Sequence, residues 1–215
     1  TSALWSDADN DGWTDLLVTV EWGPVRFFRN RKGQLVEETK AAGLHQYLGW
    51  WNGIDGRDID GDGDIDYAVT NLGLNTKYQI TGDKPLEAYY GKFGDTGQER
   101  FVESLWEGNR QFPVRGKSCS TKAMPHLKEK FKNYVSFAKA TLPQIYTNIG
   151  LSSAQHFMVN TLSSGIMVNN GEGKFSFIKL PRLAQVAPGF GVRLTEVNGD
   201  GHTDLYLVQN FFSNQ

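Results

Sequence analysis

The chain has 215 residues, of which 39% are hydrophobic and 13% aromatic, so it is long enough to bury a sizeable core. Its single cysteine, Cys119, excludes an intrachain disulfide framework and a Cys-based zinc site. The formal net charge of −2 is unevenly distributed, because half of the 24 acidic residues fall in three nine-residue windows that contain no Lys or Arg.

The first 45 residues predict two β-hairpins in succession. The first hairpin surrounds an acidic window, Asp7 to Asp15 (DADNDGWTD), which follows ALW and precedes the β-forming run LLVTV. The second is VRFFRNRKGQLVEET (25–39), with Asn30 and Gly33 at the turn between two apolar stretches. This order predicts four strands, with the acidic window in the loop between the first two.

The acidic window occurs twice more. DIDGDGDID (Asp58 to Asp66) follows WWNGI and precedes YAVTN, and EVNGDGHTD (Glu196 to Asp204) follows GVRL and precedes LYLVQ. All three windows fit the nine-position pattern acid-x-[Asp/Asn]-x-Asp-Gly-x-x-Asp. Acidic side chains at positions 1, 3 and 5 of a tight turn can converge on one cation, and Gly at position 6 lets the backbone reverse. A carbonyl at position 7 and the Asp at position 9 would complete the coordination shell.

The windows therefore predict up to three Ca²⁺ sites, because this cation takes about 6–8 oxygen ligands. An EF-hand is excluded, since position 12 is Val18, Val69 or Leu207 instead of a bidentate Glu. Magnesium is less suitable because it rarely takes all-protein cages, and an acidic turn without metal is the remaining alternative. The predicted side-chain ligands are Asp7, Asp9, Asp11 and Asp15, then Asp58, Asp60, Asp62 and Asp66, then Glu196, Asn198, Asp200 and Asp204. The predicted carbonyl ligands are Trp13, Asp64 and His202, with the Asp64 carboxylate pointing outward.

A degenerate fourth copy is predicted at Lys92–Arg100 (KFGDTGQER). Gly97 falls at position 6, but Lys92 and Arg100 stand at positions 1 and 9, where the other windows have acids. We expect a hairpin that has lost its metal; the alternative is an unrelated turn.

A helical insertion is predicted at about 115–160, where the strand rhythm breaks. Apolar residues recur there at helical spacing, at Leu127, Phe131, Val135 and Ala138. Two or three short helices are expected. The segment is rich in Lys with few acids, which indicates a solvated helix face or a patch for an anionic partner. No nucleic-acid motif accompanies it, so nucleic-acid binding is not expected.

The second kind of hairpin also recurs, at GIMVNNGEGKFSFIK (165–179), where Asn170 and Gly173 match Asn30 and Gly33. One unit is then an acidic-loop hairpin followed by an Asn-Gly hairpin, or four strands in about 45–55 residues. Four-stranded units at this period are typical of β-propeller blades.

The expected fold class is all-β, a single partial β-propeller domain over 1–215 with the helical insertion in its third blade. The expected blades are about 1–45, 46–87, 88–185 and 186–215, the last with one hairpin only. About three and a half blades leave strand edges open, so we expect part of a longer ring of seven, or self-association that closes it.

The three acidic windows resemble the calcium loops of FG-GAP/VCBS-type repeats, as in the propeller of integrin α-subunits. The stretches GWWNGIDGRDIDGDGDIDYAVTNLGLNT and VNNGEGKFSFIKLP are similar to bacterial VCBS-repeat relatives of the cartilage acidic protein (ASPIC/UnbV) group. The resemblance covers nearly the whole chain. It implies a propeller, calcium ligation by the residues named above, and an extracellular, periplasmic or cell-surface location. Glu196 and Asn198 depart from the all-Asp form of the loop.

The functional expectation is a calcium-stabilised interaction or adhesion module for a protein or glycan ligand. The alternative is a carbohydrate-active enzyme or glycan-binding domain, such as a polysaccharide lyase on a propeller. No catalytic constellation is readable, since the four histidines are scattered and no nucleophile or phosphate-loop motif occurs. The six tryptophans either fill the space between blades or stack on sugars, and Trp13 is the one expected to be exposed.

Overall fold

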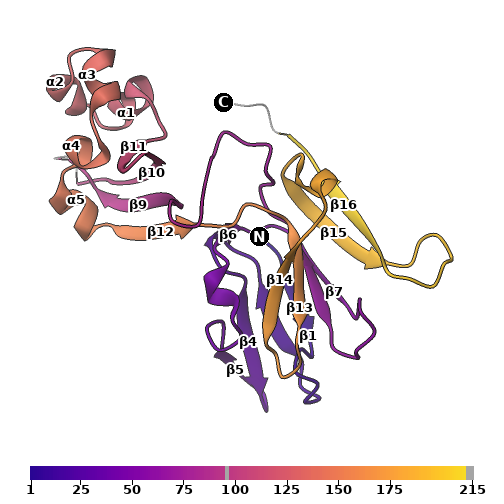
Figure 1. Cartoon of the computed structure of the whole chain (residues 1–215). Coiled ribbons are helices and arrows are strands. Elements are labelled where there is room, and N and C mark those ends of the chain that lie inside the picture. The colour runs from indigo at the N-terminus through magenta and orange to yellow at the C-terminus, as the bar shows by residue number, and fades with distance from the viewer. Residues whose placement is uncertain (95–96, 212–215) are drawn as a thin grey trace. The chain divides into compact units, whose positions relative to one another are not determined.

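The computed structural model describes residues 1–94 and 97–211 and divides the chain into two compact units (Figure 1). Unit 1 comprises Thr1–Lys77 and the chain from Thr161 onward, and unit 2 is Tyr78–Asn160. Unit 2 is therefore an insertion into the sequence of unit 1. The prediction of one domain over 1–215 did not foresee this division.

The first sheet of unit 1 is a four-stranded antiparallel meander in the order β1-β2-β4-β5. Its strands are β1 (Ala3–Ser6), β2 (Asp15–Val18), β4 (Arg26–Arg31) and β5 (Gln34–Glu37). Both predicted hairpins of the first 45 residues are confirmed, because β1 pairs with β2 and β4 with β5. The short strands β3 (Glu21–Gly23) and β6 (Gly49–Trp50) form a separate pair.

The second sheet, in the order β14-β13-β8-β7, joins segments from either side of unit 2. Its strands are β7 (Ile54–Arg57), β8 (Asp66–Val69), β13 (Gly165–Asn169) and β14 (Phe175–Lys179). The expected blade boundaries 46–87 and 88–185 are wrong in this region, because hairpin 165–179 completes the sheet that 54–69 begins. The hydrogen-bonded pairing of β8 with β13 places Met167 opposite Tyr67, a contact that no local sequence pattern marks.

The last sheet of unit 1 is a single hairpin of β15 (Gly189–Thr195) and β16 (Asp204–Gln209). It agrees with the half unit expected at 186–215, of which residues 212–215 lie outside the described part. The described part of unit 1 thus holds two four-stranded sheets, the two-stranded β15–β16 hairpin and the short β3–β6 pair, with the 3-10 turns η1 (Leu44–Gln46) and η2 (Arg182–Gln185). No sheet closes on itself within 1–94 and 97–211, and the blade count of about three and a half stays a prediction.

Unit 2 has its own four-stranded antiparallel sheet in the order β11-β10-β9-β12. The strands are β9 (Leu86–Lys92), β10 (Glu99–Glu107), β11 (Arg110–Pro113) and β12 (Gln155–Val159). The hairpin predicted at Lys92–Arg100 is confirmed, since Lys92 lies opposite Glu99 in the β9–β10 pair. Part of its turn, residues 95–96, lies outside the described residues.

Five short helices, not two or three, precede β12. They are α1 (Lys117–Ala123), α2 (Leu127–Lys130), α3 (Tyr134–Lys139), α4 (Leu142–Tyr146) and α5 (Asn148–Ser153). The protein is therefore mostly β with a helical cluster, not all-β. Among the described residues no helix is long and apolar enough to span a membrane.

The predicted helical spacing holds only for its first two members. Leu127 and Phe131 are buried, but Val135 and Ala138 are exposed. The period breaks because α2 ends before Phe131 and a new helix starts at Asn133, whose side chain accepts a hydrogen bond from the Ser136 N–H (2.8 Å).

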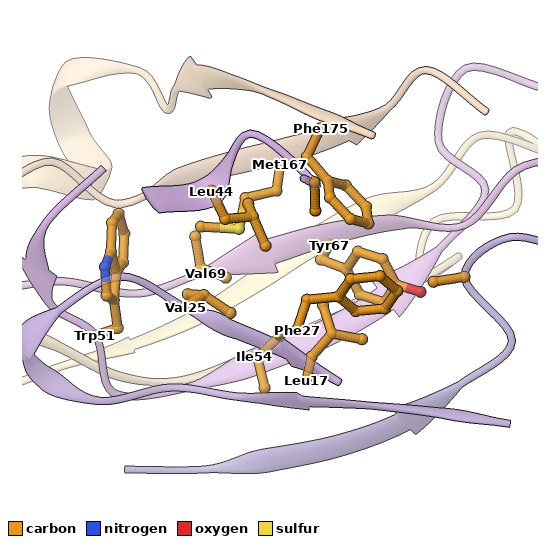
Figure 2. Packing of buried hydrophobic residues seen from close by; sticks show 12 residues of the cluster. Leu17, Val25, Phe27, Leu44, Trp51, Ile54, Tyr67, Val69, Met167 and Phe175 are labelled. Carbon is orange, nitrogen blue, oxygen red and sulfur yellow. The ribbon is translucent and has the colours of Figure 1, made fainter. Parts of the chain in front are cut away.

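The core of unit 1 is built by side chains from both four-stranded sheets (Figure 2). Phe175 lies edge-on to Phe27 and to Tyr67, with ring centroids 5.8 and 5.7 Å apart. Trp51 is fully buried in the same cluster, which fits the filling role for that tryptophan, whereas Trp13 is 45% exposed as expected. These edge-to-face aromatic contacts join the two four-stranded sheets.

The chain leaves unit 1 and returns to it beside one buried side chain, Asn71. Its Oδ1 accepts from the Trp50 and Leu72 N–H groups (3.1 and 2.8 Å), and its Nδ2 donates to the Thr161 carbonyl (2.9 Å). Its backbone N–H donates to Ser164 Oγ (2.9 Å). The two connections to unit 2 are therefore fastened at the same point of unit 1.

We expect Phe175→Ala to lower the free energy of unfolding of unit 1 by about 3–5 kcal/mol, because it removes a buried ring and leaves a cavity. Ile178→Ala is the control on the same strand, since Ile178 is 59% exposed and its truncation should change stability by less than about 0.5 kcal/mol. Urea unfolding of both variants measures the difference. Equal losses would contradict the assigned face of β14.

Candidate metal centre

The three acidic windows form three hairpin loops with one backbone geometry. Loop 1 (7–15) joins β1 to β2, loop 2 (58–66) joins β7 to β8, and loop 3 (196–204) joins β15 to β16. At position 6, φ is +86° at Gly12, +94° at Gly63 and +81° at Gly201. The predicted need for Gly is confirmed, since L side chains rarely adopt this left-handed conformation.

Position 4 of each loop is also left-handed, which the sequence analysis missed. The φ angle there is +56° at Asn10, +81° at Gly61 and +82° at Gly199. The signal was present in the residue types, because Asn and Gly tolerate this conformation best. Two left-handed residues separated by one residue make each loop a tight turn.

The position-1 carboxylate closes each of the first two loops from the inside. Asp7 accepts from the Asp11 N–H through Oδ1 (3.1 Å) and from the Gly12 N–H through Oδ2 (2.9 Å). In loop 2, Asp58 accepts from the Gly61 N–H at position 4 through Oδ1 (2.7 Å) and from the Gly63 N–H at position 6 through Oδ2 (3.1 Å). These bonds hold both carboxylates in the concave side of the turn.

The position-9 carboxylate of loop 1, Asp15, is fully buried. Its Oδ2 accepts from the Ala8 N–H in its own loop (3.0 Å), and its Oδ1 accepts from the Asn30 N–H on β4 (2.7 Å). Burial raises the pKa of Asp15, and the nearby charges of Asp9 and Asp11 raise it further, while the two backbone bonds lower it. The ionised form is thus held at a cost that a bound cation would offset.

Asp66 repeats this arrangement in loop 2 and is 1% exposed. It accepts from the Ile59 N–H (3.1 Å) and from the Asn169 N–H on β13 (2.9 Å). Burial again raises its pKa against the two backbone bonds, with the charges of Asp60 and Asp62 adding to the rise.

The residue equivalent to Asn30 in the second sheet is Asn169, so the predicted match of Asn30 with Asn170 is wrong by one position. Asn30 Nδ2 donates to the Thr14 carbonyl (2.9 Å), and Asn169 Nδ2 donates to the Ile65 carbonyl (3.3 Å), both at position 8. The turn after Asn169 is longer than the turn after Asn30, which shifted the sequence match.

The structure brings positions 1, 3 and 9 together in the first two loops. In each, one carboxylate oxygen per residue lies within 4.8 Å of the others. Oxygens at this spacing can share one ion, because Ca²⁺–O distances are about 2.3–2.6 Å. The two clusters are Asp7, Asp9 and Asp15, and Asp58, Asp60 and Asp66.

The position-5 carboxylates lie outside these clusters. Asp11 Oδ1 accepts from the Trp13 N–H (2.8 Å), and Asp62 Oδ1 accepts from the Asp64 N–H (2.9 Å). Their role as ligands, and that of the carbonyls of Trp13, Asp64 and His202, stays a prediction.

Loop 1 and loop 2 differ in their surroundings, as the contacts of Asp9 and Asp64 show. The Asp9 carboxylate forms an ion pair with Arg29 (Nη1–Oδ2 2.8 Å), and its side chain is only 5% exposed. Asp60, its counterpart in loop 2, is exposed. The Asp64 carboxylate accepts from Asn10 Nδ2 of loop 1 (2.7 Å), in agreement with its predicted exclusion from the loop 2 cluster.

Loop 3 keeps the backbone geometry but forms no comparable cluster among the described residues. Asp204 accepts from the Val197 N–H (2.9 Å), as position 9 does in the other loops. Asn198 donates through Nδ2 to Asp200 Oδ2 (3.0 Å), so an amide occupies that carboxylate oxygen. The predicted ligand Glu196 accepts from the Gly199 N–H.

Unit 2 holds a polar cluster that sequence reasoning missed, centred on the buried carboxylate of Glu87. It accepts from Tyr89 Oη (2.8 Å) and Trp106 Nε1 (2.9 Å), and its Oε2 lies 2.6 Å from His156 Nε2. The His156 ring stacks on Tyr89 at 4.7 Å between centroids. Strand pairing alone brings these residues together, because His156 on β12 lies opposite Tyr89 on β9.

Two cavities have linings made by other residues than those of the Glu87 cluster. One, of about 320 Å³ in unit 1, is lined by Asp9, Arg29, Glu38, Ala41, Ala42, Glu172, Gly173 and Lys174. The other, of about 170 Å³ in unit 2, has Cys119 and Tyr146 in its wall. Glu87 and His156 line neither cavity.

One part of the chain matches a known protein family. Residues 7–69 match the family profile described as the FG-GAP-like repeat, so the chain contains an FG-GAP repeat that includes loops 1 and 2. No curated protein matches the chain. The resemblance to FG-GAP repeats is therefore confirmed, while the narrower likeness to the ASPIC/UnbV group stays a prediction.

We expect Gly63→Ala to destabilise unit 1 by about 1–2 kcal/mol, because Ala must adopt a left-handed φ. Nothing lies within 4 Å of a Cβ built on Gly63, so the loss is conformational and not a clash. Gly63→Asn should recover part of it, and Gly191→Ala, at an ordinary φ with ordinary contacts, should be nearly neutral. Urea unfolding ranks the three variants, and an equal loss in Asn and Ala would contradict the conformational cause.

We expect the stability of unit 2 to fall as the pH drops below about 4.5. Burial raises the pKa of Glu87, but the hydrogen bonds from Tyr89, Trp106 and His156 outweigh it, so the net pKa lies below the usual 4.5. A lowered pKa in the folded state gives a stabilisation that is present above the unfolded pKa and disappears as pH falls through the folded one. Glu87→Gln should be less stable at pH 7 by about 1.5–3 kcal/mol, and its disadvantage should shrink between pH 5 and 3. Chemical unfolding at several pH values measures both; a constant difference would refute the assignment.

Proposed function

We propose that the chain is a calcium-binding section of a β-propeller interaction module that works outside the cytoplasm. The observation that carries the proposal is the pair of matched carboxylate clusters in loops 1 and 2, inside the FG-GAP-like repeat. Each cluster includes one buried acid, Asp15 or Asp66, whose pKa is raised.

Calcium is the cation that suits these donors. The clustered ligand atoms are all carboxylate oxygens, which hard cations prefer, and His and Cys are absent from both clusters. In each of loops 1 and 2, the four predicted carboxylate ligands carry more negative charge than a tight turn would keep together without a counterion. Loop 3, with Asn198 and without a comparable cluster, is proposed as the weakest of the three sites.

The proposed role of the ion is structural. The ligands of each loop come from a single hairpin, but the position-9 acid also holds the next strand through Asn30 or Asn169. An ion that draws the carboxylates together therefore strengthens a connection between hairpins. Because the unfolded chain has no such site, binding free energy adds to folding free energy.

We further propose a protein or glycan as the ligand, and an extracellular, periplasmic or cell-surface location. Support comes from the family resemblance and from the solvent exposure of the loops, which suits calcium at extracellular concentrations. A carbohydrate-active enzyme remains the alternative, for which a base beside a cavity would be the favouring observation.

Self-association or a longer chain is proposed to cover the open edges of unit 1. The edge strand β5 has all four residues exposed, including Leu35 and Val36 at 43% and 41%. Exposed edge strands are templates for further pairing. Sedimentation velocity tests self-association, which a strict monomer at high concentration would exclude.

We expect Ca²⁺ at about 100 times its dissociation constant to stabilise the protein by about 2.7 kcal/mol, or roughly 5–10 °C in Tm. EGTA should reverse the shift, and Mg²⁺ should give a smaller one. Asp58→Asn should remove loop 2 binding in a calorimetric titration. Asp64→Asn is the matched control, because Asp64 lies in the same loop but outside the cluster. No heat of binding and no change in Tm would refute the proposal.

A further inference from the structure

Asn169 lies between loop 1 and loop 2 and is 1% exposed. Its backbone N–H donates to Asp66 Oδ1 of loop 2 (2.9 Å). Its side-chain Nδ2 donates to the Ala8 carbonyl of loop 1 (2.7 Å) and to the Ile65 carbonyl of loop 2 (3.3 Å). One buried residue thus contacts both acidic loops at once.

The contact with loop 1 leads directly to its buried acid. Ala8 is 1% exposed, and its N–H donates to Asp15 Oδ2 (3.0 Å). A continuous line of hydrogen bonds therefore runs from Asp15 through Ala8 and Asn169 to Asp66. Both ends of the line are position-9 acids, and every residue along it is buried.

The corresponding residue of the first sheet, Asn30, shows which of these bonds is special. Asn30 makes the same bonds within its own sheet, to Asp15 Oδ1 (2.7 Å) and to the Thr14 carbonyl (2.9 Å). The additional bond of Asn169, to a carbonyl of another loop, has no counterpart at Asn30 among the described contacts. The chain thus contains its own control for the link between loops.

One further side chain connects the same pair of loops, and another connects loop 1 to the turn that follows Asn169. Asn10 of loop 1 donates to Asp64 Oδ1 of loop 2 (2.7 Å). Arg29, which pairs with Asp9, also donates through Nη2 to the Glu172 carbonyl in the turn that follows Asn169 (2.6 Å). These contacts are more exposed than the Asn169 line, so water competes for them more strongly.

We propose that loops 1 and 2 act as a coupled pair of calcium sites, with Asn169 as the positioning residue that couples them. The inference rests on the proposed function, because it assumes that both loops bind the ion. An ion in loop 2 orders Asp66 and the β13 backbone, and Asn169 then fixes the Ala8 carbonyl and the start of loop 1. The second ion meets a loop that is already ordered, so it loses less conformational entropy and binds more tightly.

Coupling of this kind is reciprocal, which gives a quantitative test. Disabling loop 2 with Asp58→Asn should weaken Ca²⁺ binding at loop 1 by about fivefold, at the low end of typical couplings. Disabling loop 1 with Asp7→Asn should weaken loop 2 by the same factor. Calorimetry gives the affinities, and Tb³⁺ luminescence sensitised by Trp13 reports loop 1 separately, with Trp13→Phe to assign the signal.

In an Asn169→Ala background each loop should keep its own affinity while the dependence on the other loop disappears. Asn169→Asp is the second variant, since it keeps the shape and the acceptor for the Gly171 N–H but removes the Nδ2 donor. Asn30→Ala is the control, and in that background the coupling should persist. Circular dichroism melting confirms that each variant is folded.

The possible results separate the two proposals. Ca²⁺ binding with equal affinities in the presence and absence of the other site would overturn the coupling and leave calcium binding intact. Coupling that survives in both Asn169 variants would overturn the role of Asn169. Absence of Ca²⁺ and Tb³⁺ binding in the unaltered protein would overturn the proposed function, and the coupling with it.

Discussion

Unit 1 is organised around carboxylates that are buried where the chain turns. Asp15 and Asp66 each accept one hydrogen bond from their own loop and one from the next hairpin, so a single side chain fixes both the loop and the strand beside it. Burial raises the pKa of both acids, and the backbone hydrogen bonds that they accept offset part of this desolvation cost. In both loops of the FG-GAP-like repeat, the buried acid therefore connects its own hairpin to a neighbouring strand.

The local part of this arrangement could be predicted from the sequence. Position 6 needs Gly because its φ is left-handed, and flanking apolar runs of β-forming residues gave the strands of all three loop hairpins. The spacing predicted that positions 1, 3, 5 and 9 converge, and the structure groups positions 1, 3 and 9 in loops 1 and 2 without position 5. Such features depend on residues close together in the chain, so the pattern records them directly.

The nonlocal part could not be predicted in the same way. Hairpin 165–179 resembles hairpin 25–39 in sequence, but its partner β8 lies before an insertion, and no local pattern states which strand it joins. The longer turn after Asn169 hid its equivalence to Asn30, and its bond to Ala8 depends on how two sheets pack. The polar cluster around Glu87 likewise depends on β12 pairing with β9 from 65 or more residues away along the chain.

The hydrogen bonds of Asn71 bear on how the inserted segment can change during evolution. The Asn71 amide holds both the outgoing segment at Leu72 and the returning segment at Thr161. The two chain ends that lead from the β8–β13 sheet to the inserted segment are therefore fixed, whatever residues lie between them. A segment bounded in this way can be lengthened, shortened or replaced during evolution without a change in the strands on either side. Relatives of this protein can therefore be expected to differ most in the segment between these two points, while the four-stranded sheet of β7, β8, β13 and β14 stays the same.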